Sequence, residues 1–234
     1  MIKNAIILCS GGIDSVTTAY YVKHRLNYNN ILILFFNYNQ RNVLSERKAS
    51  RKCSEYLNAD FIEINLRELG KISTSLINSI KKVNRLSRKD LKDTKEESDK
   101  YYVPQRNVIF LAYAIALAES YNIKNKQDYN IFVGFKCEGK ESYPDSTKKF
   151  IKQMNKLKSI ASIINGKIYA PLINKDKEDI ILLGKKLGVD FKETFSCYAP
   201  IKNKPCGYCL SCMLRKEGFY WAGIKDPTIY YVEN

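Results

Sequence analysis

Residues 5–15 read Ala-Ile-Ile-Leu-Cys-Ser-Gly-Gly-Ile-Asp-Ser, and this stretch decides the fold. Its first five residues are apolar and predict a short buried strand. Ser10-Gly11-Gly12 interrupts the strand, and from Ile13 the pattern is typical of a helix that runs to about His24. Glycines let the backbone turn tightly and approach an anion, and the free N–H groups of the following helix point at the same place. The stretch therefore predicts a phosphate-binding loop between a strand and a helix.

Polar side chains strengthen this loop. Ser10 and Ser15 offer hydroxyl donors, and we expect Asp14 to cap the helix or to hold Mg²⁺ beside the phosphates. The loop lacks the Gly-Lys-Ser/Thr and Gly-x-Gly-x-x-Gly patterns of two other nucleotide-binding motifs. It resembles instead the PP-loop, the Ser-Gly-Gly-x-Asp-Ser motif of GMP synthetases, argininosuccinate synthetases and tRNA-modifying enzymes. That resemblance implies cleavage of ATP between its α- and β-phosphates; a tight turn without a ligand is the alternative.

The rest of the chain alternates strands with helices. Strands are predicted at residues 31–36, 60–65, 129–134 and 168–172, and helices at 43–57, 108–120, 150–164 and 177–187. Gly188 is expected to be the C-cap of the last helix. This alternation is typical of an α/β fold with a doubly wound, parallel, five-stranded, Rossmann-like sheet, and the resemblance to the PP-loop implies the adenine nucleotide alpha hydrolase type. Residues 81–100 hold 13 charged side chains in 20, which indicates a surface excursion, either a lid or a solvated insertion.

Composition limits the class of protein. The chain has 234 residues, 45% of them hydrophobic, so residues 1–234 are expected to form a single domain around one sizeable core. It has no apolar run of about 18 residues and no signal-peptide pattern, so we expect a cytoplasmic protein without a membrane segment. The formal charge of +15 favours anionic partners such as nucleotides, pyrophosphate or nucleic acid. Lysines that merely solvate the surface would give the same charge.

Four of the seven cysteines crowd together near the C-terminus: Cys197, Cys206, Cys209 and Cys212. Their spacing, Cys-x8-Cys-x2-Cys-x2-Cys, lets four thiolates converge on one ion in a tetrahedral shell. Because a closed shell leaves no position for water, we predict structural Zn²⁺ in a segment at about residues 196–220 that contributes to folding. An iron–sulfur cluster and a redox Cys-x-x-Cys pair are the alternatives.

Further blocks follow the PP-loop in a fixed order: Phe36-Asn37-Tyr38-Asn39-Gln40-Arg41, Val103-Pro104-Gln105-Arg106-Asn107, Ser142-Tyr143-Pro144-Asp145, the cysteine cluster and Leu214–Phe219. In order and spacing, from about residue 5 to 220, the chain resembles the 7-cyano-7-deazaguanine synthase (QueC) family. The resemblance implies an ATP-dependent ligase that converts 7-carboxy-7-deazaguanine and ammonia to the nitrile. The acid and then the amide are adenylated, AMP and pyrophosphate are released, and the product enters the queuosine or archaeosine pathway.

The same resemblance implies roles for individual residues. The ATP site would consist of Ser10, Gly11, Gly12, Ile13, Asp14, Ser15, Asn37, Arg41, Arg106 and Asn107. Asn37 and Arg41 follow a strand at its carboxyl end, where open α/β sheets place ligands. A guanidinium at Arg106 suits the negative charge that develops on pyrophosphate or adenylate, with helix capping as the alternative.

The substrate site would consist of Glu138, Tyr143 and Asp145. Asp145 would pair with the amino-pyrimidine edge of a deazaguanine and Tyr143 would stack on its ring; an ordinary Pro-Asp turn is the alternative. Asp14, Arg106 and Asp145 are the residues that the resemblance makes catalytic. The expected partners are ATP, ammonia and the small-molecule acid, with no membrane, no stable nucleic acid and a homodimer left open.

Two features qualify the resemblance. The family usually has glycine where Gln105 stands, and glutamine makes a positive φ harder to adopt. The lone histidine, His24, lies late in the first helix, so general-base work is expected from a carboxylate, the substrate or water. Three other functions stay open: a tRNA-thiolating or lysidine-forming PP-loop enzyme, a zinc-stabilised nucleotide-binding protein without catalysis, and a relative that conjugates a deazaguanine to a macromolecule.

Overall fold

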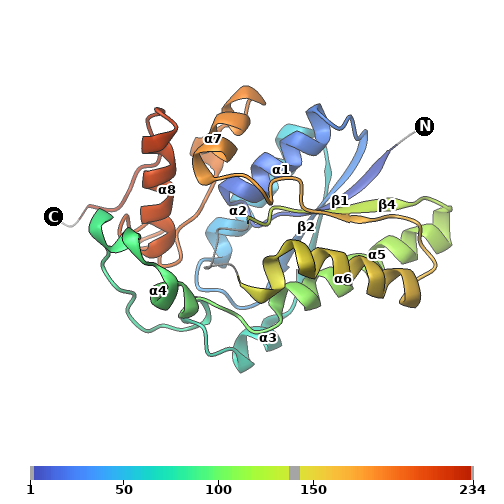
Figure 1. Ribbon diagram of the computed structural model, residues 1–234, viewed down its shortest axis with the longest axis horizontal. Coiled ribbons are helices and arrows are strands. Elements are labelled where there is room, and N and C mark those ends of the chain that lie inside the picture. Colours follow the sequence, from blue (N-terminus) through green and yellow to red (C-terminus); the bar gives the residue numbers. More distant parts are fainter. Residues whose placement is uncertain (1–2, 137–142, 233–234) are drawn as a thin grey trace.

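The computed structural model describes residues 3–136 and 143–232, and its centre is a parallel sheet (Figure 1). The five strands are β1 (Asn4–Leu8), β2 (Asn30–Asn37), β3 (Asp60–Asn65), β4 (Tyr129–Val133) and β5 (Ile168–Tyr169). They lie in the order β3-β2-β1-β4-β5, and every neighbouring pair is parallel. The predicted five-stranded, doubly wound sheet is confirmed, although β5 has only two residues where five were predicted.

Helices cover both faces of this sheet (Figure 1). The first face carries α1 (Ile13–His24), α2 (Val43–Leu57) and α7 (Lys177–Lys186), and the second carries α5 (Arg106–Asn125) and α6 (Lys148–Ala161). Side chains alternate along a strand, so Ile7 packs in the core under α1 whereas its neighbour Ile6 packs in the core under α5. Burial on both faces explains why β1 and β2 read as nearly continuous apolar runs, whereas the half-buried edge strand β3 includes Asp60 and Glu63.

A long excursion joins β3 to α5 along the carboxyl end of the sheet. It contains α3 (Arg67–Ile72), two short 3₁₀ turns, η1 (Leu76–Asn78) and η2 (Arg88–Lys92), and α4 (Lys95–Asp99). The Leu86 N–H donates to the Tyr208 carbonyl at 3.0 Å, and Arg88 pairs with Glu217 at 2.9 Å. The charged segment predicted as a surface excursion therefore packs against the C-terminal part of the chain, near α8 in Figure 1.

The C-terminal part is more regular than predicted. One 3₁₀ turn, η4 (Pro144–Ser146), precedes α6, and another, η5 (Phe191–Glu193), follows α7. The last described helix is α8 (Leu210–Trp221), which packs against α7. No helix was predicted after residue 187, yet α8 begins at the residue after Cys209. Buried Arg215 on α8 pairs with Asp226 at 3.1 Å and donates to the Phe191 carbonyl at 2.9 Å, which fixes the helix to its surroundings. Within the described ranges, no helix combines the length and the apolar character needed to cross a membrane.

Candidate active site

The strand order reverses beside β1, where β2 lies on one side and β4 on the other. Ligands of open α/β sheets bind in the crevice outside the carboxyl ends of the strands at such a point. Two chain segments meet there: the PP-loop, residues 10–15, and Gly134 at the end of β4. A Cβ at Gly134 would lie 2.8 Å from the Cα of Ser15, so only glycine lets β4 end against the loop. The sequence showed that this strand ends in glycine but not what the glycine touches.

The PP-loop is held tightly against α2. Gly11 has φ +79°, and a Cβ there would lie 2.5 Å from the Cβ of Ala49 and 2.9 Å from the backbone N of Ser50. The Phe195 N–H donates to the Gly11 carbonyl at 2.8 Å, and the Ser15 hydroxyl donates to the Gly12 carbonyl at 3.1 Å. The structure thus has the predicted strand, glycine turn and helix, with the first turn of α1 at the crevice.

Asp14 does not cap α1, which corrects one of its two expected roles. Gly12 occupies the N-cap position, and Asp14 lies in the first helical turn. Both carboxylate oxygens instead accept from Nζ of Lys177, at 2.6 and 2.7 Å. Burial, with the charge of Lys177 acting in the same direction, lowers the pKa of Lys136 to about 8. These two lysines were not predicted as site residues, since neither lies in a motif.

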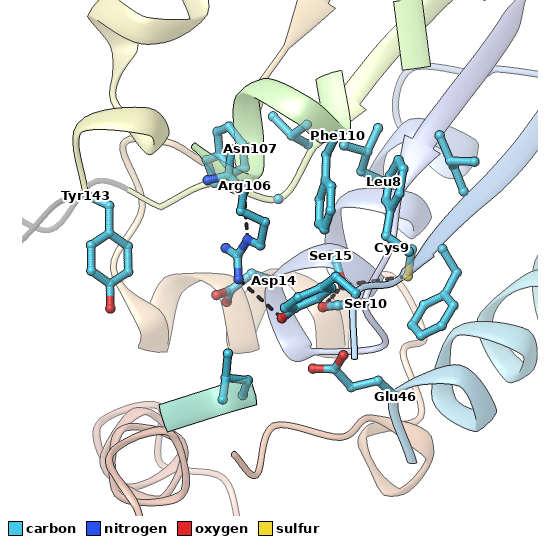
Figure 2. A pocket seen from close by; sticks show the side chains of 18 of the residues that line it. Leu8, Cys9, Ser10, Asp14, Ser15, Glu46, Arg106, Asn107, Phe110 and Tyr143 are labelled. Carbon is cyan, nitrogen blue, oxygen red and sulfur yellow. Dashed lines mark hydrogen bonds between the residues drawn. The ribbon is translucent and has the colours of Figure 1, made fainter. Parts of the chain in front are cut away.

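Two cavities open beside the PP-loop, and both reach Asp14, Arg106, Gly134 and Tyr198. The first, about 300 Å³, is here named the apolar cavity because Leu34, Phe36 and Phe110 form much of its wall. The second, about 290 Å³, is named the basic cavity because Lys136, Lys177 and Arg215 line it. Figure 2 shows Ser10, Ser15, Asp14 and Arg106 around the apolar cavity. Because the two cavities share these lining residues, they are together called the cleft.

Arg106 and Asn107 open α5 at this cleft, as predicted. The Arg106 guanidinium lies 5.6 Å from the ring centroid of Tyr38 and donates to the Tyr38 hydroxyl at 3.4 Å. Burial raises the pKa of Tyr38 to about 12, although Arg106 acts in the opposite direction. The preceding residue, Gln105, adopts φ +57°, so it takes the left-handed conformation that the sequence led us to doubt for glutamine. The turn into α5 therefore has the shape that glycine would allow.

Asp145 and Tyr143 are anchored to protein groups. The Asp145 carboxylate accepts from the Asn107 N–H at 3.2 Å, so it serves the start of α5, and Asp145 is not among the residues that line the two cavities. Tyr143 lines both cavities, and its hydroxyl donates to the Ser98 carbonyl at 2.6 Å. Its ring stacks on Tyr102 with centroids 5.1 Å apart. Glu138, the third expected substrate residue, lies outside the described residues.

The cleft does not include two of the expected nucleotide-binding side chains. Arg41 donates to the Lys81 carbonyl at 2.9 Å, and Asn37 accepts from the Asn39 N–H at 3.2 Å. Neither is among the described residues that line the two cavities. The same segment does contribute Tyr38, and α2 contributes Glu46. Neither residue was predicted, because only cationic and amide side chains of residues 36–41 were considered and Glu46 lies outside that block.

The four C-terminal cysteines converge as their spacing predicted. Their sulfur atoms all lie within 4.8 Å of one another and all four side chains are buried, with Cys197–Cys209 and Cys206–Cys212 separations of 4.0 Å. Four thiolates on one tetrahedral ion at a metal–sulfur distance of about 2.3 Å would be roughly 3.8 Å apart. The N–H groups of Ala199 and Cys206 donate to the Cys197 sulfur. The cluster can therefore hold a metal ion.

This cluster also shapes the cleft. Tyr198, the residue after Cys197, is half-buried and lines both cavities, and its ring lies 4.5 Å from that of Tyr101. Asn42 joins the two regions from the other side, because its amide donates to the Cys197 carbonyl at 2.8 Å and to Glu46 at 3.0 Å. One wall of the cleft is thus fixed by the segment that carries the cysteines.

Comparison with known proteins gives a consistent result over the whole chain. A family model described as "Queuosine biosynthesis protein QueC" matches residues 4–223. A 7-cyano-7-deazaguanine synthase from Rickettsia bellii is 37% identical over 232 residues, which are 97% of this chain and 98% of the relative. Those from Syntrophus aciditrophicus and Leptospira biflexa are 37% and 32% identical, and each match covers 97% of this chain and 96% and 94% of the relative. The PP-loop, both cavities and the cysteine cluster all lie within the matched residues.

Proposed function

This chain belongs to the QueC family of queuosine biosynthesis proteins, and from that premise we propose that it is an ATP-dependent ligase that makes 7-cyano-7-deazaguanine. The substrates are 7-carboxy-7-deazaguanine, ammonia and two molecules of ATP. A carboxylate oxygen is a poor leaving group, and transfer of AMP to it makes it a good one. The first adenylation allows ammonia to form the amide, and the second allows the amide oxygen to leave as AMP, which gives the nitrile.

The PP-loop supports the placement of ATP. Its glycine turn and the first turn of α1 face a cleft of which one part is apolar and the other basic. A planar adenine suits the walls of Leu34, Phe36 and Phe110, and the triphosphate suits the N–H groups of residues 10–15 with Lys136 and Lys177 beyond them. In this arrangement the α-phosphorus lies between the two cavities, where the substrate oxygen can reach it.

Arg106 supports an anionic ligand by its place in the fold. It is the first residue of α5, where the helix dipole disfavours a cation, and its guanidinium is directed into the cleft. A phosphate or adenylate bound between Arg106 and the PP-loop removes this conflict. Asp14 would exchange its pairing with Lys177 for Mg²⁺ beside the phosphates, which leaves Lys177 to bind a phosphate oxygen. Both residues act on ATP in this scheme.

The cysteine cluster would hold structural Zn²⁺. All four protein ligands come from one segment and the sulfur atoms are close enough for a single ion. An iron–sulfur cluster would place several irons and sulfides between the same thiolates, which suits more widely spaced sulfur atoms. Zinc would supply no chemistry in the cleft; it would fix Tyr198 in the wall.

The alternative of a PP-loop enzyme acting on tRNA is not favoured, because the family match spans residues 4–223 and the relatives are matched over nearly their whole length. Gln105 was the feature that kept a deazaguanine-conjugating relative open. Since its backbone adopts the conformation open to glycine, the loop it controls gives no reason for a different substrate.

One observation carries the proposal: the PP-loop faces a cleft with an apolar and a basic part, in a chain that matches one family along its length. The test is to incubate purified protein with ATP, ammonium and 7-carboxy-7-deazaguanine and to follow the amide and the nitrile by mass spectrometry. AMP and pyrophosphate should appear only when the acid is present. Release of pyrophosphate that depends on tRNA and not on the acid would overturn the assignment.

A further inference from the structure

Glu46 lies in the wall of the apolar cavity without an ion-pair partner among the described residues. It is in the first turn of α2, and its carboxylate accepts from the side-chain amides of Gln40 at 2.9 Å and Asn42 at 3.0 Å. Neutral donors on both oxygens hold the group in place without cancelling its charge. Figure 2 shows Glu46 on the same cavity as Ser10 and Ser15.

The packing that closes the PP-loop also sets the position of Glu46. A Cβ at Gly11 would lie 2.9 Å from the carbonyl oxygen of Glu46, so the backbone of this residue is in contact with the loop. The loop cannot move relative to α2 without moving relative to this carboxylate. Glu46 is therefore placed beside the atoms that would hold the phosphates of ATP.

The proposed reaction needs a group at the cleft that accepts protons. When the nitrogen lone pair of ammonia attacks the acyl adenylate, the C–N bond forms, one proton leaves nitrogen, and AMP departs with the electron pair of the C–O bond. After the second adenylation, the amide nitrogen loses two protons as its electrons form the nitrile and AMP again departs with the C–O pair. Three protons thus leave one nitrogen atom, and the protein has to supply a base near it.

The other carboxylate at the cleft and the one histidine are less suited to this task. Asp14 and Glu46 are the carboxylates among the described lining residues, and Asp14 is paired with Lys177. His24 lies at the end of α1, against Tyr20, and outside the lining. The charged or titratable groups that face Glu46 are Arg106 and Tyr38.

Burial gives Glu46 a suitable acidity. Desolvation raises its pKa to about 7, while the amides of Gln40 and Asn42 and the charge of Arg106 act in the opposite direction. A base titrating near the working pH can both accept a proton and release it within one turnover.

We propose that Glu46 is the proton acceptor for ammonia addition and for nitrile formation in this cleft. The inference rests on the proposed ligase function and adds to it a residue outside the PP-loop. It predicts that removal of the carboxylate separates two partial reactions: adenylation of the acid, which releases pyrophosphate and moves no proton from nitrogen, and the amination that follows.

The test compares Glu46→Gln with Glu55→Gln, a control on the same helix whose exposed carboxylate pairs with Lys52. Exchange of labelled pyrophosphate into ATP, dependent on the acid and without ammonium, measures adenylation. Single-turnover amide formation measures amination, with rates expressed per free ammonia from pH 6 to 9. We expect Glu46→Gln to keep exchange within about threefold of the unsubstituted protein and to lose amination by about 10²- to 10⁴-fold.

Hydroxylamine provides a readout that a structural role would not change. It attacks as a neutral amine and gives an adduct acidic enough to pass its proton to water, so it should largely restore acyl transfer in Glu46→Gln. In the unsubstituted protein, amination by ammonia should show an acidic limb with an apparent pKa near 7 that hydroxylamine lacks. This comparison needs no variant and tests the inference even if Glu46→Gln does not fold.

Three results would overturn the inference: normal amination by Glu46→Gln, a parallel loss of exchange and amination in folded protein, or the same pH profile for both nucleophiles. These results are distinct from a failure of the proposed function, which would appear as absence of acid-dependent exchange in the unsubstituted protein.

Discussion

Replacement of Gly11 by alanine tests how closely the PP-loop and α2 are packed. At φ +79° an alanine has to adopt the left-handed conformation, which costs roughly 1–2 kcal/mol relative to glycine. Its Cβ would also meet the Cβ of Ala49 at 2.5 Å and two backbone atoms of α2 at 2.9 Å, and overpacking of this kind typically costs about 1–3 kcal/mol. The free energy of unfolding should therefore fall by about 2–5 kcal/mol.

Gly188 offers a matched control. It has φ +83° and nothing lies within 4 Å of a Cβ built there, so Gly188→Ala carries the conformational cost alone, about 1–2 kcal/mol. Urea unfolding of both variants measures the difference, which we expect to be about 1–3 kcal/mol. Acid-dependent pyrophosphate exchange measures the site: Gly188→Ala should keep it, whereas Gly11→Ala should lose about 10²-fold because the loop is displaced. Equal stability of the two variants, with exchange retained in Gly11→Ala, would refute the close packing on which the site depends.

Four further substitutions address other parts of the molecule. Cys209→Ser should lower the metal content per chain and the melting temperature together, whereas Asp14→Ala should lose pyrophosphate release and keep its metal, as measured by elemental analysis beside the activity assay. Lys177→Met should weaken ATP binding by about tenfold or more in titration calorimetry, while Lys186→Met on the exposed side of the same helix should not; equal affinities would remove Lys177 from the site. The folded protein binds a proton at Glu46 more tightly than the unfolded chain does, so the stability from this group is present below about pH 4.5 and is lost as the pH rises through about 7. Glu46→Gln should flatten the fall in unfolding free energy between pH 5 and 8, and an unchanged slope in urea unfolding at several pH values would contradict the raised pKa.

Much of the fold is predictable from the sequence because the strands are buried on both faces. The run at residues 31–36 is apolar throughout and the run at 129–134 is apolar except for Asn130, and the helices between them have clear glycine or polar boundaries. Helix α8 was missed for a physical reason: its buried face consists of Leu210, Cys212, Arg215, Gly218 and Phe219, so polar and small residues break the hydrophobic period. Short β5 was overestimated because Ala170 and Leu172 are apolar without pairing in the sheet.

The candidate site was predictable only where a local motif defines it. The PP-loop and the cysteine cluster are short in sequence, and their geometry follows from spacing. The pair Asp14–Lys177 joins residues 163 positions apart, and Glu46 reaches the cleft only because α2 packs on Gly11. Arg41 and Asn37 were predicted to bind ATP because of their place at the carboxyl end of β2. Side chains at a strand end point in alternate directions, however, and it is Tyr38 that faces the cleft.

The position of Tyr198 beside Cys197, a proposed metal ligand, has a consequence for the coupling of the two half-reactions. Any water that reaches an acyl adenylate hydrolyses it. The wall that Tyr198 helps to form would therefore limit the hydrolysis of ATP without formation of product. If the C-terminal segment that carries Tyr198 detached, the chain would retain the strand, loop and helix that cleave the nucleotide. It would then hydrolyse ATP without forming product. Natural selection on the four thiols would then act on the yield of product per ATP as well as on folding.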